Sequence, residues 1–310
     1  MSDMDRRDFL KSVSVVAAAA TVTGLSATSA MAQGAPYPSD ASKTGNIYEV
    51  YALMYETPVR YKLAKALYQV GFDQDFSVNL YIWAAINKKN GEVTLIDTGC
   101  APELGEIFRK ANEPNATYTA PWVLVERLGI KPEQVTRVII THMHSDHCNG
   151  MLEFPKRYPN AQFYVQKRDV DFWAYDPQVR TKPAFSQFLN QPGVDAVVAA
   201  IKSGRCTVVD GDQFVGPEMQ VLLAPGHSPG LQCVVLPTAK GTTIVASDLG
   251  HIHRSFSELR PSGIIIDIRP WMDSFDKVLP RAPLANIFSG HDAKMDTDFP
   301  RVAECITRLA

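Results

Sequence analysis

Three things are scarce in this sequence of 310 residues: cysteine, a surplus of charge of one sign, and long apolar runs. Five cysteines are too few and too scattered for a scaffold built on disulfides, and their odd number leaves at least one unpaired. The 31 Lys and Arg residues nearly balance the 33 Asp and Glu residues, which gives a net charge of -2. This balance argues against a nucleic-acid-binding surface and against a long acidic disordered tail. Because no apolar run approaches the roughly 20 residues of a transmembrane helix, we expect no membrane-spanning segment.

The first 32 residues have the parts of an export signal. Arg6 and Arg7 stand in a charged start, a short Ala-rich apolar stretch follows, and Ala30-Met31-Ala32 supplies a small-x-small end. The paired arginines resemble the twin-arginine type of signal. The order of these parts predicts export to the periplasm and cleavage after the small-x-small end. Because Ser, Thr and Gly dilute the apolar stretch, we expect no stable membrane insertion afterwards. A frayed amphipathic helix or a membrane anchor is the alternative, and the short, diluted apolar stretch argues against the anchor.

The remainder predicts one domain after a short lead-in. Residues 33–45 are rich in Pro, Ser, Ala and Gly, which is typical of a flexible segment. Residues 46–310 show no internal repeat and no composition break. Apolar residues make up 45% of the chain and charged residues 21%, so a sizeable core can be buried.

Short runs of β type alternate with helical stretches along this domain, which predicts an α+β or α/β layered fold. We expect ten strands, at Ile47–Leu53, Asn79–Ile86, Val93–Asp97, Arg137–Thr141, Gln162–Gln166, Cys206–Val209, Met219–Leu223, Gln232–Leu236, Thr243–Ser247 and Asn286–Phe288. We expect four helices, at Val59–Val70, Glu103–Ala111, Pro121–Leu128 and Val194–Lys202.

One short run carries most of the chemical information. After the apolar residues 138–140 come His142, His144, Asp146 and His147, which are four metal-competent side chains within six residues. Imidazole and carboxylate are ligands of zinc and its neighbours. In an extended segment His142 and His144 point to the same side and can bind one ion. Asp146 and His147 lie where the chain turns and can face a second ion.

Three further candidates each follow a predicted strand. His227 lies in the turn-rich run Ala224–Gly230, Asp248 ends the strand Thr243–Ser247, and His291 follows Gly290. A strand end holds a side chain on a rigid element, as a metal site requires. Five of the seven histidines therefore fall at candidate ligand positions, and only His251 and His253 are left over.

Along the chain the motifs follow the order His-x-His-x-Asp-His, Gly-His, Asp and Gly-His. This order resembles that of the metal ligands in the metallo-β-lactamase superfamily. Within it, Thr-His-x-His-x-Asp-His at 141–147 and Pro-Gly-His-Ser-Pro-Gly at 225–230 are most similar to the N-acyl-homoserine lactonase-like hydrolases. The resemblance implies that residues 46–310 form a four-layer αββα sandwich, a single hydrolase domain with metals at one edge of two sheets. Asp97, in the Asp-Thr-Gly run 97–99, is expected to orient a ligand through a hydrogen bond.

The resemblance also assigns roles. It implies that His142, His144 and His227 hold a first ion, that Asp146, His147 and His291 hold a second, and that Asp248 bridges both. Two Zn²⁺ ions are expected, and iron, manganese or cobalt would suit the same ligands. A metal-bridging hydroxide would attack the carbonyl of a small-molecule lactone or ester resembling an N-acyl-homoserine lactone. Asp146 would carry the proton to the leaving oxygen.

The sequence departs from the lactonase pattern at one position. These enzymes usually have a tyrosine three residues after the bridging aspartate, and here that position is His251. His251 is either a hydrogen-bond donor to the substrate or an ordinary loop residue. Cys148 is expected to be packed and inert.

Several alternatives follow from the same resemblance. Other lactones, cyclic carbamates, thioesters and β-lactams are possible substrates, and a non-hydrolytic metal or redox protein could share the fold. A β-lactamase with a similar first motif generally lacks the bridging aspartate. A glyoxalase-like thioesterase normally has a helical domain after the last histidine, where only 19 residues follow His291 here. Di-iron redox members usually have Glu at the position of His144. The oligomeric state is left open.

Overall fold

The computed structural model describes residue 45, residues 47–105 and residues 116–310. All of them belong to the second of two compact units, Ala35–Ala310. The predicted export signal and residues 33–44 of the lead-in lie outside the described residues. In the part of the chain that is described, no helix combines the length and the apolar character needed to cross a membrane.

Fourteen strands of the described residues join in a hydrogen-bonded sheet whose main path runs β12-β11-β10-β1-β2-β3-β5-β6-β7. The strands are β1 (Tyr48–Lys62), β2 (Asp75–Asn87), β3 (Val93–Ile96), β4 (Thr117–Tyr118), β5 (Val135–Ile139), β6 (Gln162–Gln166), β7 (Cys206–Val209), β8 (Gln213–Gly216), β9 (Met219–Leu223), β10 (Gln232–Thr238), β11 (Gly241–Ser247), β12 (Ile287–Ser289), β13 (Arg301–Ala303) and β14 (Ile306–Arg308).

The path folds over between β10 and β1, where only the parallel pair Tyr48 and Thr238 connects the strands. We call β1–β7, with β13 and β14 attached to β1, the first sheet, and β8–β12 the second sheet. Side chains from both sheets meet in one buried cluster that includes Trp83 of β2 and Val234 of β10. The two sheets are therefore packed face to face.

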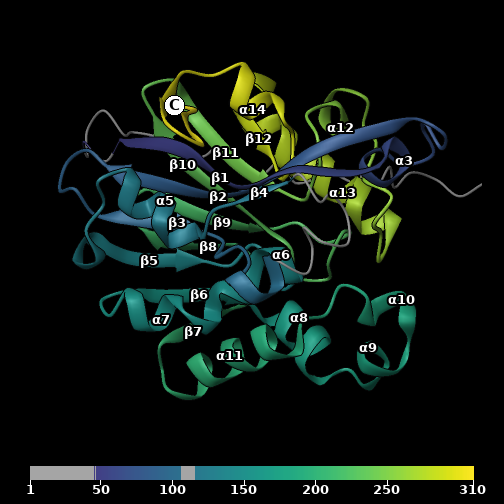
Figure 1. The fold of residues 1–310 in the computed structure, drawn as a ribbon, viewed down its shortest axis with the longest axis horizontal. Helices are drawn as coiled ribbons and strands as arrows, with labels where there is room; N and C mark the ends of the chain where they lie inside the picture. The colour runs from purple at the N-terminus through teal and green to yellow at the C-terminus, as the bar shows by residue number, and fades with distance from the viewer. Residues whose placement is uncertain (1–44, 46, 106–115) are drawn as a thin grey trace, which may run out of the picture. The chain divides into compact units, whose positions relative to one another are not determined.

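Helices cover the two outer faces. They are α3 (Leu63–Ala66), α5 (Pro121–Arg127), α6 (Ser145–Cys148), α7 (Phe154–Arg157), α8 (Lys167–Val170), α9 (Pro177–Thr181), α10 (Pro183–Ser186), α11 (Gln191–Lys202), α12 (Arg254–Ser257), α13 (Ile268–Val278) and α14 (Lys294–Thr297), with short 3₁₀ and π turns between them. One buried cluster joins the first sheet to α5, α7 and α11, and another joins the second sheet to α12 and α13. Figure 1 shows α7 and α11 on one side of the strands and α12 and α13 on the other.

Strand β2 shows why the sequence requires four layers. Leu80, Ile82 and Ala84 pack in the cluster under the helices, whereas Tyr81 and Trp83 pack between the sheets. A strand with apolar side chains on both faces needs a layer on each side. The predicted four-layer αββα sandwich is confirmed.

The predicted helix Val59–Val70 is wrong. Strand β1 continues to Lys62, and only Leu63–Ala66 is helical. The segment alternates, with Val59 and Tyr61 on one face and Arg60 and Lys62 on the other, which is the period of a strand. Hydrogen-bonded pairing with β2, from Val59 through Lys62, stabilises the extended form.

The other helix predictions had mixed outcomes. Helix α5 matches the prediction within one residue, and α11 starts three residues before the predicted Val194. The predicted Glu103–Ala111 lies mostly outside the described residues. Helix α13 was missed, although Trp271, Phe275 and Val278 are buried at helical spacing, because Pro270 interrupts the pattern.

Candidate metal centre and active site

The candidate ligands come from strand ends of both sheets. In the first sheet β3, β5 and β6 are parallel, so their carboxyl ends lie together. In the second sheet β11 and β12 are parallel, and β9 runs the same way because both β9 and β11 are antiparallel to β10. The two sets meet where Thr141 Oγ lies 2.9 Å from Ser247 Oγ. The segments that follow these strands therefore gather at one edge of the sandwich.

His142, His144 and His227 form the first cluster, which we call the three-histidine group. Their nearest ring nitrogens all lie within 4.8 Å of one another. His144 Nδ1 is 3.1 Å from His142 Nε2 and 2.9 Å from His227 Nε2. All three side chains are buried. The group combines two ligands of the first sheet with one of the second.

Asp146, His147 and His291 form the second cluster, which we call the mixed group. Asp146 Oδ2 lies 3.6 Å from His147 Nε2 and 3.7 Å from His291 Nε2. The side chain of Asp146 is 25% exposed, whereas His147 and His291 are nearly inaccessible. The carboxylate is therefore the open side of this group.

Asp248 lies between the two groups. Its Oδ2 is 3.2 Å from His227 Nε2, and its Oδ1 is 3.6 Å from His147 Nε2 and 3.1 Å from His291 Nε2. Gly290 permits this approach, because a Cβ there would lie 1.9 Å from Asp248 Oδ1. His291 Nε2 is also 3.1 Å from Asp248 Oδ2, so the carboxylate adjoins both groups, as a bridging ligand requires.

His251 also belongs to this edge. Its Nε2 is 3.0 Å from Asp248 Oδ2, and with His227 and Asp248 it forms a further possible ligand set. Burial lowers the pKa of His251 to about 4. All seven predicted ligands and His251 therefore lie in one cluster, whereas His253 lies outside it and contacts the Leu284 carbonyl.

Hydrogen bonds outside the cluster orient several of the histidines. His227 Nδ1 lies 3.0 Å from the Ile264 carbonyl oxygen and His291 Nδ1 lies 3.2 Å from that of Asn79. Each ring can donate Nδ1–H to its carbonyl, which leaves Nε2 with a free lone pair aimed at the centre.

Asp97 holds His147 in the way that the sequence predicts. Its Oδ2 lies 2.8 Å from His147 Nδ1, and its two oxygens accept hydrogen bonds from the backbone N–H and hydroxyl of Thr141. Asp97 has a φ of 65°, a backbone conformation that non-glycine residues rarely adopt. The strained residue at the end of β3 thus supports the mixed group.

Asp169 is a buried carboxylate that the sequence did not single out. Its oxygens accept hydrogen bonds from Met143 N at 2.6 Å, Ser228 Oγ at 2.5 Å and Gly230 N at 2.6 Å. Asp169 therefore ties the loop of His142 and His144 to the loop of His227. Burial raises its pKa to about 6, against the opposing effect of these hydrogen bonds. The feature of the sequence that could have identified Asp169 is its position soon after the end of β6.

The charge state of the cluster suits divalent ions. Burial and neighbouring imidazoles hold the pKa of His142 and of His144 well below the ordinary value, so both rings are neutral. Burial would lower the pKa of His147, but the carboxylates of Asp146 and Asp248 outweigh it and raise that pKa. Burial would raise the pKa of Asp248, but His291 and His251 keep it well below the usual range. A divalent ion can replace protons held in this way.

Some polar atoms at the centre lack hydrogen-bond partners in the protein. Nε2 of His147 and Oδ1 of Asp248 are buried and form no hydrogen bond among the described residues. Unsatisfied buried polar atoms are costly, and lone pairs that converge on one point are what a metal ion uses. The residues present therefore fit divalent metal ions.

A pocket opens onto this centre. It is lined by the cluster residues His144, Asp146, His227, Asp248, His251 and His291 together with Val59, Tyr61, Lys65, Val78, Leu80, Ser145, Gln187, Phe188 and Ile264. The wall away from the ligands is mainly apolar, and the β1–β2 hairpin supplies much of it. The segment around residues 59–65 thus covers the centre as a hairpin and not as the predicted helix.

The cysteines take no part in the ligand cluster. All five lie within the described residues and are free thiols. Cys148 follows His147 and is buried, which raises the pKa of its thiol well above the ordinary value. The expectation of a packed residue at this position is confirmed.

The fold and the ligand cluster define a metal-dependent hydrolase. The family model of the metallo-β-lactamase superfamily matches residues 76–291, and the chain belongs to this superfamily. The matched region contains all seven predicted ligands.

Relatives and solved structures agree with this assignment. An N-acyl homoserine lactonase of Bacillus cereus is 24% identical over 198 residues, which cover 59% of this chain and 70% of the relative. The N-acyl homoserine lactonase AttM of Azorhizobium caulinodans is 27% identical over 182 residues, 54% of this chain and 62% of the relative.

A crystal structure of a quorum-quenching N-acyl homoserine lactone lactonase is similar in fold. It has a TM-score of 0.63 and 16% identity, with 83% of this chain and 97% of that chain covered. AidC, a dizinc quorum-quenching lactonase, has a TM-score of 0.60 and 19% identity, with 79% and 88% covered.

Proposed function

We propose that this chain opens the ring of a lactone resembling an N-acyl-homoserine lactone, with two divalent ions held by the three-histidine group, the mixed group and Asp248. The observation that carries the proposal is that both groups adjoin one carboxylate and open into one pocket. The lactonase names of the relatives support the choice of substrate. The apolar wall of Val59, Val78 and Leu80 suits an acyl chain.

Ions bound there would lower the pKa of water toward neutrality and polarise a carbonyl group. Zinc suits the nitrogen and oxygen ligands, and iron, manganese or cobalt would suit them too. The rest of the chemistry belongs to the side chains. The Nδ1 contacts of His147, His227 and His291 fix the directions of the ligand atoms.

Asp146 is the side chain in the position to move a proton. As the accessible member of the mixed group it faces the pocket. When water adds to the lactone carbonyl, the Asp146 carboxylate takes the proton. It then delivers that proton to the ring oxygen as the carbon–oxygen bond breaks, which yields a hydroxy acid.

His251 is the second candidate for contact with the substrate. It lines the pocket, and its buried Nδ1 has no partner among the described residues. In its neutral form the ring can donate one hydrogen bond to a substrate oxygen. We propose this role for His251 beside its contact with Asp248.

A substrate panel tests the function. The purified zinc-loaded enzyme is assayed with N-hexanoyl-homoserine lactone, plain γ- and δ-lactones, a cyclic carbamate, a thioester and nitrocefin, and its metal content is measured. We expect about two ions per chain and the highest kcat/KM on a lactone. A higher kcat/KM on nitrocefin or on the thioester would contradict the proposed substrate class.

A pair of histidine variants provides the internal control. His251→Ala should reduce lactone turnover, because the residue lines the pocket. His253→Ala should leave it unchanged, because this neighbour lies outside the ligand cluster. Equal losses in the two variants would exclude a specific role for His251.

We further propose that residues 1–32 direct export to the periplasm by the twin-arginine route. The support is the order of the paired arginines, the apolar stretch and Ala30-Met31-Ala32. Replacing Arg6 and Arg7 with lysine should leave the uncleaved precursor in the cytoplasmic fraction. Normal cleavage and periplasmic activity of that variant would contradict the proposal.

A further inference from the structure

The proposed reaction leaves one phenol in the pocket without a function. Tyr61 lies near the end of β1 and lines the pocket together with Asp146 and Asp248. Its hydroxyl oxygen is buried, yet it has no hydrogen-bond partner among the described residues. Leaving a buried hydroxyl without a partner is costly, so such a group usually finds a partner when a ligand binds.

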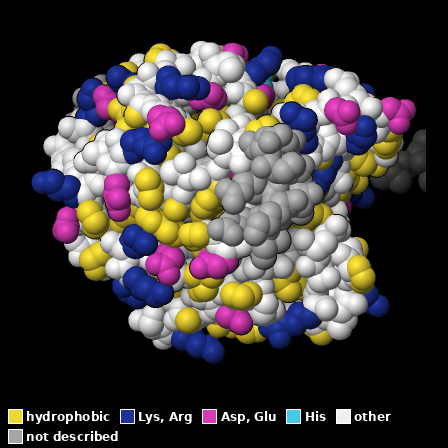
Figure 2. Space-filling model, in the orientation of Figure 1, with side chains coloured by type: hydrophobic (Ala, Val, Ile, Leu, Met, Phe, Trp, Pro, Cys, Tyr) yellow, Lys and Arg dark blue, Asp and Glu magenta, His cyan; other side chains and the backbone are white. Residues whose placement is uncertain are grey.

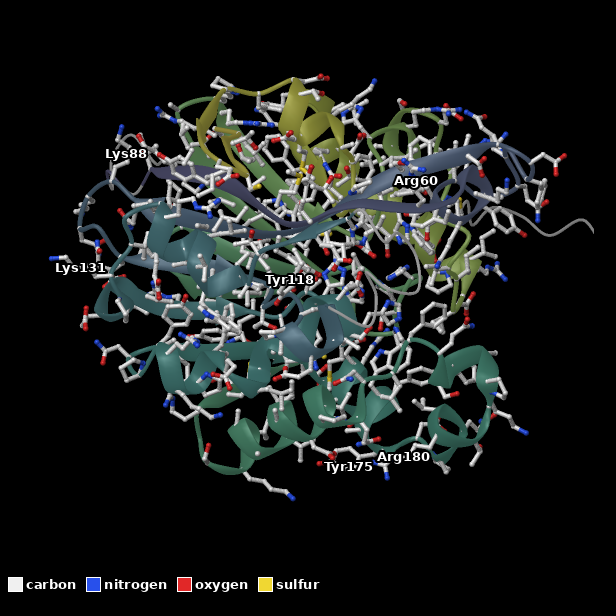
Figure 3. The ribbon with its side chains drawn as sticks, in the orientation of Figure 1. Arg60, Lys88, Tyr118, Lys131, Tyr175 and Arg180 are labelled. Atoms are coloured by element: carbon white, nitrogen blue, oxygen red, sulfur yellow. The ribbon has the colours of Figure 1, made fainter. Side chains whose placement is uncertain are left out.

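The strand sets the direction of this side chain. Successive residues of a strand point to opposite faces, and Arg60, which Figure 3 labels on the long hairpin, is exposed. Tyr61 therefore points to the other face, where it packs with the cluster of Leu63, Val78 and Ile252. Ile252 directly follows His251, so this packing brings the ring next to the ligand loop.

Backbone hydrogen bonds hold the connection between β1 and β2 against the segment around residues 261–263. Gly263 N donates to the Lys65 carbonyl at 2.9 Å, and Tyr68 N donates to the Pro261 carbonyl at 2.8 Å. The ammonium of Lys65 lies 5.1 Å from the centre of the Tyr61 ring, a distance at which a cation and a ring attract each other. The phenol is thus positioned before any substrate arrives.

The surroundings make the hydroxyl a donor. Burial raises the pKa of Tyr61 well above its usual value, and the carboxylates of Asp248 and Asp146 raise it further. The group stays protonated at neutral pH and can offer an O–H to an acceptor in the pocket. Because Tyr61 lines the pocket together with Asp146 and Asp248, the acceptor to consider is the reacting end of the substrate.

We propose that the Tyr61 hydroxyl donates a hydrogen bond to the carbonyl oxygen of the ring that is opened. This inference rests on the proposed lactone hydrolysis. The carbonyl oxygen becomes more negative as water adds, so a fixed donor stabilises the transition state more than the bound substrate. The role is carried by β1, far in sequence from the ligand loops.

Tyr61→Phe tests the inference, because it removes the hydroxyl and keeps the ring. Tyr68→Phe is the matched control, since Tyr68 lies in the same hairpin and does not line the pocket. Each zinc-loaded variant is assayed with N-hexanoyl-homoserine lactone and with a plain γ-lactone that has no amide. We expect Tyr61→Phe to lower kcat about 10²-fold on both substrates, with little change in KM.

Zinc content and thermal melting are measured in parallel, and both should match the wild type in Tyr61→Phe. Wild-type kcat in this variant would overturn the inference while the proposed function stands. A loss confined to the substrate with an amide would also overturn it, because the donor would then serve the acyl chain. If the wild-type enzyme opens neither lactone, the proposed function fails and the inference fails with it.

Discussion

The three-histidine group and the mixed group differ in both chemistry and access. The first consists of buried imidazoles, two of which burial keeps neutral, and Asp169 ties its loops together. The second contains a carboxylate with a quarter of its surface exposed, and Asp97 supports it through His147. A closed set of imidazole ligands suits binding of an ion and orientation of a carbonyl. An open carboxylate suits the movement of protons between water and substrate.

The largest expected effect comes from removing what the two groups share. Asp248→Ala deletes the carboxylate that adjoins both groups. We expect metal content to fall below two ions per chain. Lactone turnover should fall by about 10³-fold or more, since metal chemistry supplies several kcal/mol of transition-state stabilisation. Retention of two ions in elemental analysis would show that Asp248 does not join the groups.

Asp146→Asn separates proton transfer from ligand geometry. The amide keeps the size of the side chain but cannot accept a proton at neutral pH. If Asp146 carries the proton, kcat should fall by about 10²-fold or more. Steady-state kinetics with measured zinc content distinguishes this effect from metal loss. Wild-type kcat at full zinc occupancy would remove Asp146 from that role.

Asp97 orients a histidine of the mixed group, and Asp169 joins the loops of the three-histidine group. The variants Asp97→Ala and Asp169→Ala test these two roles. Loss of an outer partner typically lowers metal affinity or activity by about 10–100-fold. We expect each variant to weaken one ion and to spare the other, which competition with a chromophoric chelator resolves as two phases. If both variants weakened both ions equally, the two groups would behave as one unit.

The smallest expected effect is a pH dependence of stability in the metal-free protein. The pKa of Asp169 is raised to about 6 in the folded chain, above the value of about 4 for an unfolded Asp. Between these values the unfolded chain loses the proton and the folded chain keeps it, so wild-type stability falls as pH rises.

Asp169→Asn lacks this titration. Relative to the wild type, its free energy of unfolding should rise by on the order of 2–3 kcal/mol between pH 4 and pH 6 and then stay level. Urea unfolding at a series of pH values measures the difference. A constant difference from pH 4 to pH 8 would argue that Asp169 has an ordinary pKa.

Residue order was enough to predict the ligand candidates, and the family resemblance carried by that order implied the four layers. The run from His142 to His147 combines scarce residue types at close spacing, which chance rarely produces. Asp169 was missed because a single aspartate carries no such pattern, and its partners lie 26 to 61 residues away. The segment after Val59 was misread because Leu63, Ala66 and Leu67 satisfy a helical period, whereas pairing with β2 decides the outcome.

Each ligand group takes members from both sheets, with His227, Asp248 and His291 from the second and the others from the first. Neither sheet by itself presents a complete coordination sphere. A complete ligand set therefore exists only where the two sheets are docked, and a bound ion would connect them. Metal binding would therefore increase the stability of the docked sheets as well as supporting catalysis.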